Sequence, residues 1–327
     1  MEESGPPPIP LLPPSELEPP EVAEFLPPSI IKTPPPKPFP GLVQALGLIA
    51  LLMGMQLLVI AAVSAIDYFL KRGLALNPLT LGLTNLVSFG VACTIAGWRA
   101  GLPLSGLLRQ APPAGTFTTW TVLALFHAVL GQIFCSMGII YAIAGKAVEK
   151  SEYVERLNRL VGPGQSWWAV VPLLVIVAPV TEEVLFRGQF LRGFLGRYSP
   201  AVAIGLSAVL FSAIHLNPVQ IPATLMLGIL SGILFLRTRS VWPSIAAHML
   251  NNSFPALAVI GASRAKPAVV KNAAELTMPT AIGLMVAGLV IWLLALHALR
   301  QWLPAAEPPA DGQPEPPDDD VARLEVH

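Results

Sequence analysis

The sequence predicts an all-α polytopic membrane protein, with about eight transmembrane helices that enclose a polar cavity. Of its 327 residues, 54% are hydrophobic and only 12% are charged. Soluble domains carry about 25% charged residues, so this composition is typical of the membrane class. Apolar runs of about 20 residues, the length that crosses the hydrocarbon core of a bilayer, recur along the middle of the chain. We therefore expect an integral, multi-pass protein of the cell (plasma) membrane.

The predicted spans follow one another between two polar tails. In chain order they cover residues 41–70, 78–98, 118–145, 167–195, 200–216, 218–236, 241–260 and 279–303. Between the third and fourth spans, residues 146–160 interleave apolar and charged side chains in a loosely helical pattern. That pattern is typical of an amphipathic helix at the membrane interface. Lysine and arginine are nearly equally divided between the two sides, so charge does not assign the orientation.

Proline dominates both ends of the chain, which gives three predicted regions. Residues 1–40 are a proline-rich tail that cannot form a helix or a sheet ladder, so we expect disorder there. Residues 41–303 form the membrane domain, with a candidate functional core at about 167–252, and residues 304–327 form an acidic, proline-rich, disordered tail. The start of the chain lacks a basic segment followed by an apolar core, so we do not expect a cleaved signal peptide. The net charge of zero gives no reason to expect nucleic acid as a partner.

Polar and ionisable side chains interrupt three of the apolar segments. They are the charged group Glu182, Glu183 and Arg187, and two spaced pairs, Phe211 with His215 and His248 with Asn252. A charged side chain at membrane depth costs several kcal/mol unless it is paired or faces water, so such residues are functional candidates. Each pair is spaced i, i+4, which places both members on one face of a helix. The three groups together predict a buried reaction centre.

The sequence lacks the signatures of several known classes of protease that cut inside membranes. No G-x-S-x-G sequence is present for a serine nucleophile, and no H-E-x-x-H sequence is present for zinc. Asp67 is the only aspartate before the acidic tail, so a pair of catalytic aspartates is not available. The remaining candidates for catalytic groups are a glutamate and two histidines from separate helices.

The spacing of the two adjacent glutamates predicts different tasks for them. Glu183 and Arg187 are i, i+4 and can form an ion pair along one helix face, which would hold the site rigid. Glu182 lies about 100° round the same helix and is free to face a cavity as a general base.

The residues on the later segments supply the other groups that hydrolysis of an amide needs. His215 could share or orient the attacking water. His248 and Asn252 could donate hydrogen bonds to a developing oxyanion. Asn251 is a rival to its neighbour for that task, and Phe211 is expected to pack and to shape the cavity.

The ordered patterns E-E-x-x-x-R at 182–187, F-x-x-x-H at 211–215 and H-x-x-x-N at 248–252 resemble the CPBP family. That family comprises the CAAX-prenyl-protease-2-like and the bacteriocin-processing or immunity proteins, also called Abi. The resemblance covers about residues 167–252. It implies an intramembrane glutamic endopeptidase with a wet, lipid-accessible cavity, of a kind formerly grouped with metalloproteases.

The resemblance also implies roles for the motif residues. Glu182 together with His215 would activate water, and His248 with Asn252 would polarise the scissile carbonyl. The second glutamate and the arginine of the first motif would be supporting or substrate-binding groups. Members of the prenyl-protease branch remove the last three residues from a prenylated C-terminal Cys-a-a-X, which suggests CAAX-like processing here.

Three alternatives stay open at the level of sequence. One is a non-catalytic membrane scaffold or bacteriocin-immunity protein. Another is a proton-coupled transporter, although no inverted repeat is visible. The third is a zinc-dependent protease, because one glutamate and two histidines leave a fourth zinc position for water. We favour a site without a metal or other cofactor, since an asparagine and a histidine suit an oxyanion better than a metal. The expected partners are a membrane-associated peptide or lipoprotein substrate and membrane lipid.

Overall fold

The structure is a computed structural model that describes residues 38–71, 78–102, 104–145, 171–264 and 277–306. The predicted interfacial helix at 146–160 lies outside these residues, as do the stretches 1–37 and 307–327 of the two tails. The domain boundaries therefore stay predictions. Within the described ranges every regular element is a helix and none is a strand, which confirms the all-α fold class.

Each predicted apolar segment contains one or more helices in the part that the structure describes. In chain order the elements are α1 (Leu42–Leu70), α2 (Pro78–Ala100), α3 (Leu104–Arg109), α4 (Thr119–Ala144), η5 (Leu173–Val177), α7 (Ala178–Glu183), η6 (Val184–Leu191), α8 (Arg192–Leu195), α9 (Pro200–Ala213), α10 (Ile221–Thr238), α11 (Trp242–Arg264) and α13 (Met278–Trp302). The short α3 has no counterpart among the predicted segments, because 6 residues are too few to show a helical period.

Several of these helices can cross a bilayer by length and composition. Among the described residues 5 helices qualify, namely α1, the part Thr80–Ala100 of α2, α4, α10 and α13. Helix α9 is apolar but shorter, with 14 residues. The chain is therefore an integral membrane protein with several spans, while eight as the number of spans stays a prediction.

The fifth predicted span is shorter than expected because it ends in a turn. Helix α9 ends at Ala213, and Leu216 has a φ of 49°, in the left-handed region. Pro218 follows, and a proline disfavours the helical conformation of the residue before it. His215 therefore lies in the turn after α9. Its Nδ1 donates a hydrogen bond of 2.9 Å to the carbonyl of Phe211, so the two motif residues still meet.

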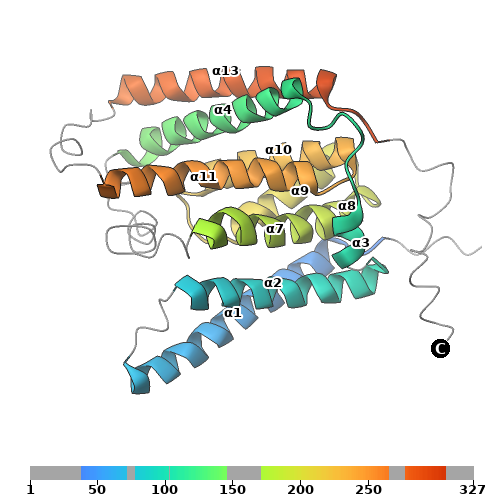
Figure 1. Ribbon diagram of the computed structural model, residues 1–327, viewed down its shortest axis with the longest axis vertical. Coiled ribbons are helices and arrows are strands. Elements are labelled where there is room, and N and C mark those ends of the chain that lie inside the picture. The colour runs from blue at the N-terminus through green and yellow to red at the C-terminus, as the bar shows by residue number, and fades with distance from the viewer. Residues whose placement is uncertain (1–37, 72–77, 103, 146–170, 265–276, 307–327) are drawn as a thin grey trace, which may run out of the picture. The chain divides into compact units, whose positions relative to one another are not determined.

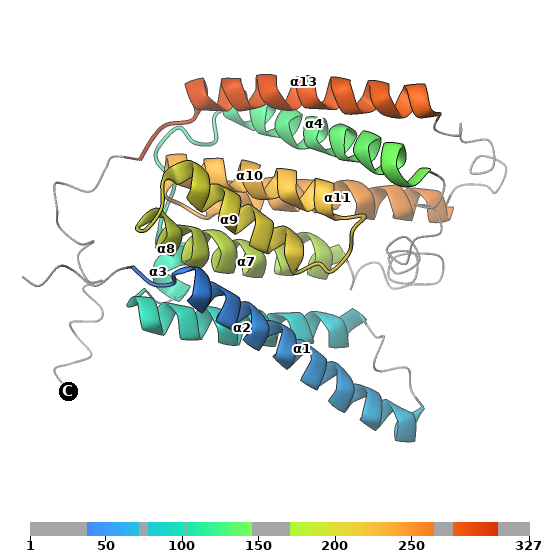
Figure 2. The ribbon, with the colours of Figure 1, turned by 180° about the vertical axis from the view of Figure 1, so that it is seen from behind.

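The described helices pack in layers around the segment that carries the glutamates (Figure 1). Helices α4 and α13 lie side by side at one edge, and α1 and α2 lie at the other, as the view from behind in Figure 2 also shows. Between them, the rod formed by η5, α7, η6 and α8 contacts α2 on one side and α9, α10 and α11 on the other. All 8 residues of η6 are buried. The fold thus encloses the first motif on both sides.

Helices α4 and α13 approach closely because a glycine lies at their contact. A Cβ atom added at Gly131 would lie 2.6 Å from the backbone nitrogen of Trp292. Small residues allow this close packing between membrane helices. We expect Gly131→Ala to lower the free energy of unfolding by about 1–3 kcal/mol, because the extra methyl group must displace the backbone of α13.

Thermal unfolding in detergent micelles checks this expectation. The matched control is Gly47→Ala in α1, where an added Cβ meets no atom within 4 Å. An unfolding temperature for the Gly131 variant that equals that of the control would contradict the packing argument.

Candidate active site

The two glutamates end a short α-helical segment that lies between two π-helical segments. The wider turns of η5 and η6 were not expected from the sequence. In η5 the amide of Ala178 donates to the carbonyl of Leu173 instead of Leu174, and Pro179 has no amide proton to donate. The carbonyl of Leu174 is therefore left without a helical partner, and it accepts a hydrogen bond of 2.9 Å from Nδ2 of Asn252. The proline thus creates the backbone acceptor that holds a predicted site residue.

Glu183 is the centre of a buried charge network. Its Oε1 accepts hydrogen bonds from Nη1 of Arg187 at 3.0 Å and from Nδ1 of His248 at 2.9 Å. The side chains of Glu183 and Arg187 are completely buried, and that of His248 is 4% exposed. The ion pair expected from the i, i+4 spacing is present in the structure. Both donors bind the same oxygen of Glu183, and its other oxygen, Oε2, is buried without a hydrogen-bond partner among the described residues.

Arg187 links the central rod to two further helices. Its Nη2 donates a hydrogen bond of 3.0 Å to the carbonyl of Gly228 in α10. Its guanidinium carbon lies 4.6 Å from the ring centroid of Phe211 in α9, within the range of a cation–π contact. Phe211 is fully buried.

His248 joins the two glutamates. A carboxylate can only accept, so Nδ1 of His248 carries the proton that it donates to Glu183. Its other ring nitrogen, Nε2, lies 3.9 Å from Oε2 of Glu182, whose side chain is 12% exposed. The sequence grouped His248 with Asn252 through their spacing and gave no sign of the contact with Glu183, since that contact joins α7 to α11.

His215 lies beside the same cluster but makes different contacts. The ring of Phe211 stands edge-on to both histidines, with centroid distances of 5.2 Å to His215 and 5.5 Å to His248. In the described part of the chain no hydrogen bond or ion pair joins His215 to Glu182. The two histidines therefore lie around one phenylalanine, and of these two only His248 lies within 4.0 Å of a glutamate oxygen among the described residues.

Asn252 belongs to a chain of amide side chains. Its Oδ1 accepts a hydrogen bond of 3.0 Å from Nδ2 of Asn251. Oδ1 of Asn251 in turn accepts a hydrogen bond of 3.1 Å from Nε2 of Gln132 in α4. Gln132 was missed by the sequence reasoning. Its only signal was an amide in the uncharged apolar segment 118–145.

The described residues do not form a set of zinc ligands. Among the described residues, no group of three or more His, Cys, Asp and Glu side chains is arranged to hold a metal ion. The oxygen Oε1 of Glu183 and the nitrogen Nδ1 of His248 already bind each other. A reaction without a metal stays a prediction.

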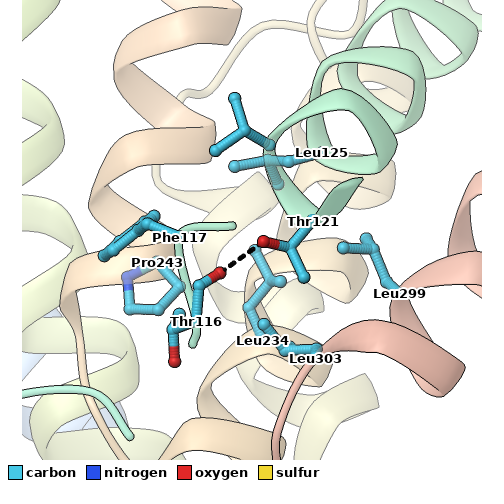
Figure 3. A pocket seen from close by; sticks show the side chains of 9 residues that line it. Thr116, Phe117, Thr121, Leu125, Leu234, Pro243, Leu299 and Leu303 are labelled. Atoms are coloured by element: carbon cyan, nitrogen blue, oxygen red, sulfur yellow. Dashed lines mark hydrogen bonds between the residues drawn. The ribbon is translucent and has the colours of Figure 1, made fainter. Parts of the chain in front are cut away.

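Two cavities lie outside this cluster of side chains. A small one of about 10 Å³ lies at the start of α4, with room for at most one water molecule (Figure 3). It is lined by threonine and apolar side chains and by no titratable residue, so it is not a candidate for catalysis. A larger crevice of about 260 Å³ lies between α1, α2 and the segment η5–α7. Its lining includes Leu174, whose carbonyl holds Asn252.

Comparisons with known proteins agree with the motifs. A family model described as "Rce1-like: Type II CAAX prenyl endopeptidase Rce1-like" matches residues 164–254, the stretch that contains every predicted site residue. A protein of Bacillus subtilis (strain 168) named "Putative membrane peptidase YdiL" is 27% identical over 181 residues, which are 53% of this chain and 70% of that protein. No solved structure matches the chain. The family model and the relative confirm the resemblance to the CPBP family that the sequence motifs carry, over the stretch that contains these motifs.

Proposed function

We propose that the chain is an intramembrane endopeptidase in which Glu182 activates a water molecule for attack on a peptide bond. The observation that carries the proposal is the difference between the two adjacent glutamates. Glu183 is completely buried and occupied by two hydrogen-bond donors, whereas Glu182 is partly exposed. The only ion-pair partner that the described residues give Glu182 within 4.0 Å is His248. Glu182 is thus the carboxylate that has room for water.

The proposed reaction uses Glu182 as both base and acid. The carboxylate takes a proton from water as the water oxygen attacks the carbonyl carbon of the scissile bond. The carbonyl oxygen then carries negative charge, which preorganised N–H donors stabilise. Nε2–H of His248 in its imidazolium form and Nδ2–H of Asn252 are the proposed donors. Collapse of the intermediate breaks the C–N bond, and Glu182 returns its proton to the leaving amine.

His215 has a supporting role in this scheme. Its Nδ1 donates to the carbonyl of Phe211, so Nε2 of the neutral ring retains a lone pair that can accept a hydrogen bond from the attacking water. A shared water molecule would join His215 to Glu182 without direct contact between them. The edge-on packing against Phe211 holds the ring in place.

The proposed substrate is a membrane-associated peptide or lipoprotein, with CAAX-like C-terminal processing as the specific form. The crevice between α1, α2 and η5 supports this substrate class, because its lining is mainly apolar and includes Leu174, whose carbonyl accepts a hydrogen bond from Asn252. An amide pair, Gln56 and Asn85, adds polar atoms to the same lining. The matching family model is also described as a prenyl endopeptidase. We place the protein in the plasma membrane, and we propose a reaction without a metal.

A comparison of protein termini tests the peptidase proposal. Membranes are prepared from cells that express the wild type or Glu182→Ala at matched levels, and the N- and C-termini of all membrane proteins are mapped by mass spectrometry. We expect new termini with the wild type alone. Loss of three residues after a lipid-modified cysteine would identify CAAX-like processing. Identical terminus maps from two folded proteins would contradict the peptidase and favour a scaffold or immunity protein.

A further inference from the structure

We infer that Gln132 is a positioning residue for the reaction, and that it acts through Asn251 on the amide of Asn252. The inference rests on the proposed function. Gln132 lies in α4, outside the stretch 164–254 that matches the family model, and no sequence motif includes it. Its side chain reaches the site through a hydrogen bond to Asn251 in α11.

The hydrogen bonds form one continuous chain between two backbone carbonyls. Nε2 of Gln132 donates to the carbonyl of Ala223 in α10 at 3.0 Å and to Oδ1 of Asn251 at 3.1 Å. Nδ2 of Asn251 donates to Oδ1 of Asn252 at 3.0 Å. Nδ2 of Asn252 then donates to the carbonyl of Leu174 at 2.9 Å. This series of hydrogen bonds therefore joins α4, α10, α11 and η5.

The direction of every hydrogen bond in this chain is determined at its ends. The carbonyls of Ala223 and Leu174 can only accept, so the amide groups that meet them must present nitrogen. With the nitrogen of Gln132 at one end, Asn251 must present its oxygen to Gln132 and its nitrogen to Asn252. Oδ1 of Asn252 then accepts from Asn251, which agrees with the other end of the series, where Nδ2 of Asn252 faces the carbonyl of Leu174. Each amide thus has one orientation that satisfies all of its neighbours.

This arrangement bears on catalysis because an amide nitrogen has two hydrogens. One hydrogen on Nδ2 of Asn252 is bound to Leu174, and the second remains to meet an oxyanion. Rotation of the Asn252 amide by 180° would place an oxygen there, which repels negative charge. Without Gln132 the amide of Asn251 loses the donor that fixes its own orientation, and it then holds Asn252 less well.

Packing between helices accounts poorly for Gln132. Its side chain is completely buried, and its Oε1 has no hydrogen-bond partner among the described residues. A buried polar atom without a partner costs free energy that an apolar side chain of the same volume would avoid. A role in positioning Asn252 gives a reason for an amide at this place.

A double-mutant cycle tests the inference. Gln132→Met and Asn252→Ala are made singly and together, and kcat and KM are measured on the substrate identified from the terminus maps. We expect Gln132→Met to lower kcat by roughly 10–100-fold with KM changed by less than about twofold, since misplacement of an oxyanion donor affects the transition state. In the Asn252→Ala background, Gln132→Met should cause no further loss of kcat, because the hydrogen bonds that link it to the site are already broken.

The control is Ser136→Ala, one turn further along α4, where a buried hydroxyl bonds only to the carbonyl of Gln132 among the described residues.

The outcomes separate this inference from the proposed function. Activity of the wild type with none from Glu182→Ala supports the peptidase, whatever Gln132 does. An unchanged kcat for Gln132→Met, or equal losses in both backgrounds, would then overturn the positioning role. Equal rates of substrate cleavage by the wild type and Glu182→Ala would overturn the proposed function and this role with it. If Gln132→Met does not fold, Gln132→Asn takes its place in the same cycle, because the shorter side chain keeps a polar amide in α4 but withdraws the donor from Asn251.

Discussion

Replacement of Glu183 by alanine should lower the free energy of unfolding by about 3–5 kcal/mol, because it leaves buried charge without a partner. Arg187 is completely buried and has no other acidic partner within 4.0 Å among the described residues. Its remaining contacts are a hydrogen bond to the carbonyl of Gly228 and the ring of Phe211, neither of which neutralises its charge. His248 would lose the acceptor of its Nδ1 proton at the same time. Thermal or denaturant unfolding in micelles measures the change.

The neighbouring glutamate provides the control for this prediction. Glu182 is partly exposed, and its closest described ion-pair distance is 3.9 Å, so Glu182→Ala should change the unfolding temperature little. Arg187→Met together with Glu183→Leu removes both charges and should recover part of the lost stability, since a buried pair can be replaced by apolar groups at low cost. Equal destabilisation by the two single alanine variants would contradict the assignment of Glu183 as the structural member of the pair.

Replacement of Glu182 by glutamine should reduce cleavage by roughly 10²–10⁴-fold, the range that general acid–base catalysis contributes. Glutamine has nearly the same shape but cannot take a proton from water or return one to the leaving amine. Because the side chain is partly exposed and makes no close ion pair, we expect the variant to fold like the wild type. The measurement is the rate of substrate cleavage by purified protein in lipid vesicles.

A metal chelator provides the control for this measurement. If protein groups and water carry out the reaction, the wild type should keep its activity after treatment with a zinc chelator, and added zinc should not change it. Activity that is lost with the chelator and returns with zinc would favour the zinc alternative. Cleavage by Glu182→Gln at the wild-type rate would show that another residue is the base.

The helical fold was predictable because the bilayer imposes a length on each apolar segment. Helix α1 begins one residue after the expected start at 41, and α4 covers all but the two end residues of 118–145. The end of α9 was placed too late, because the apolar pattern continues past Ala213 while Pro218 and the left-handed Leu216 end the helix. The π-helical turns were also missed, since periodicity does not distinguish them from α-helix in an apolar run.

The site was predictable where its residues are close in sequence. The pairing of Glu183 with Arg187 follows from i, i+4 spacing, and the structure contains it. The bond between Glu183 and His248 joins residues 65 positions apart, and that between Gln132 and Asn251 joins residues 119 apart. Such contacts depend on how the helices pack, which no local pattern encodes. The motifs therefore supplied candidate site residues, and the long-range partners of those residues came from the structure.

The division of labour between the two adjacent glutamates is the central claim, and one paired measurement tests it most directly. Glu182→Gln and Glu183→Gln are purified in the same lipid vesicles, and the cleavage rate and unfolding temperature are determined on each preparation. We predict that Glu182→Gln unfolds at the wild-type temperature and does not cleave, whereas Glu183→Gln unfolds at a clearly lower temperature. A Glu182→Gln protein that cleaves normally, or a Glu183→Gln protein that is as stable as the wild type, would contradict the account.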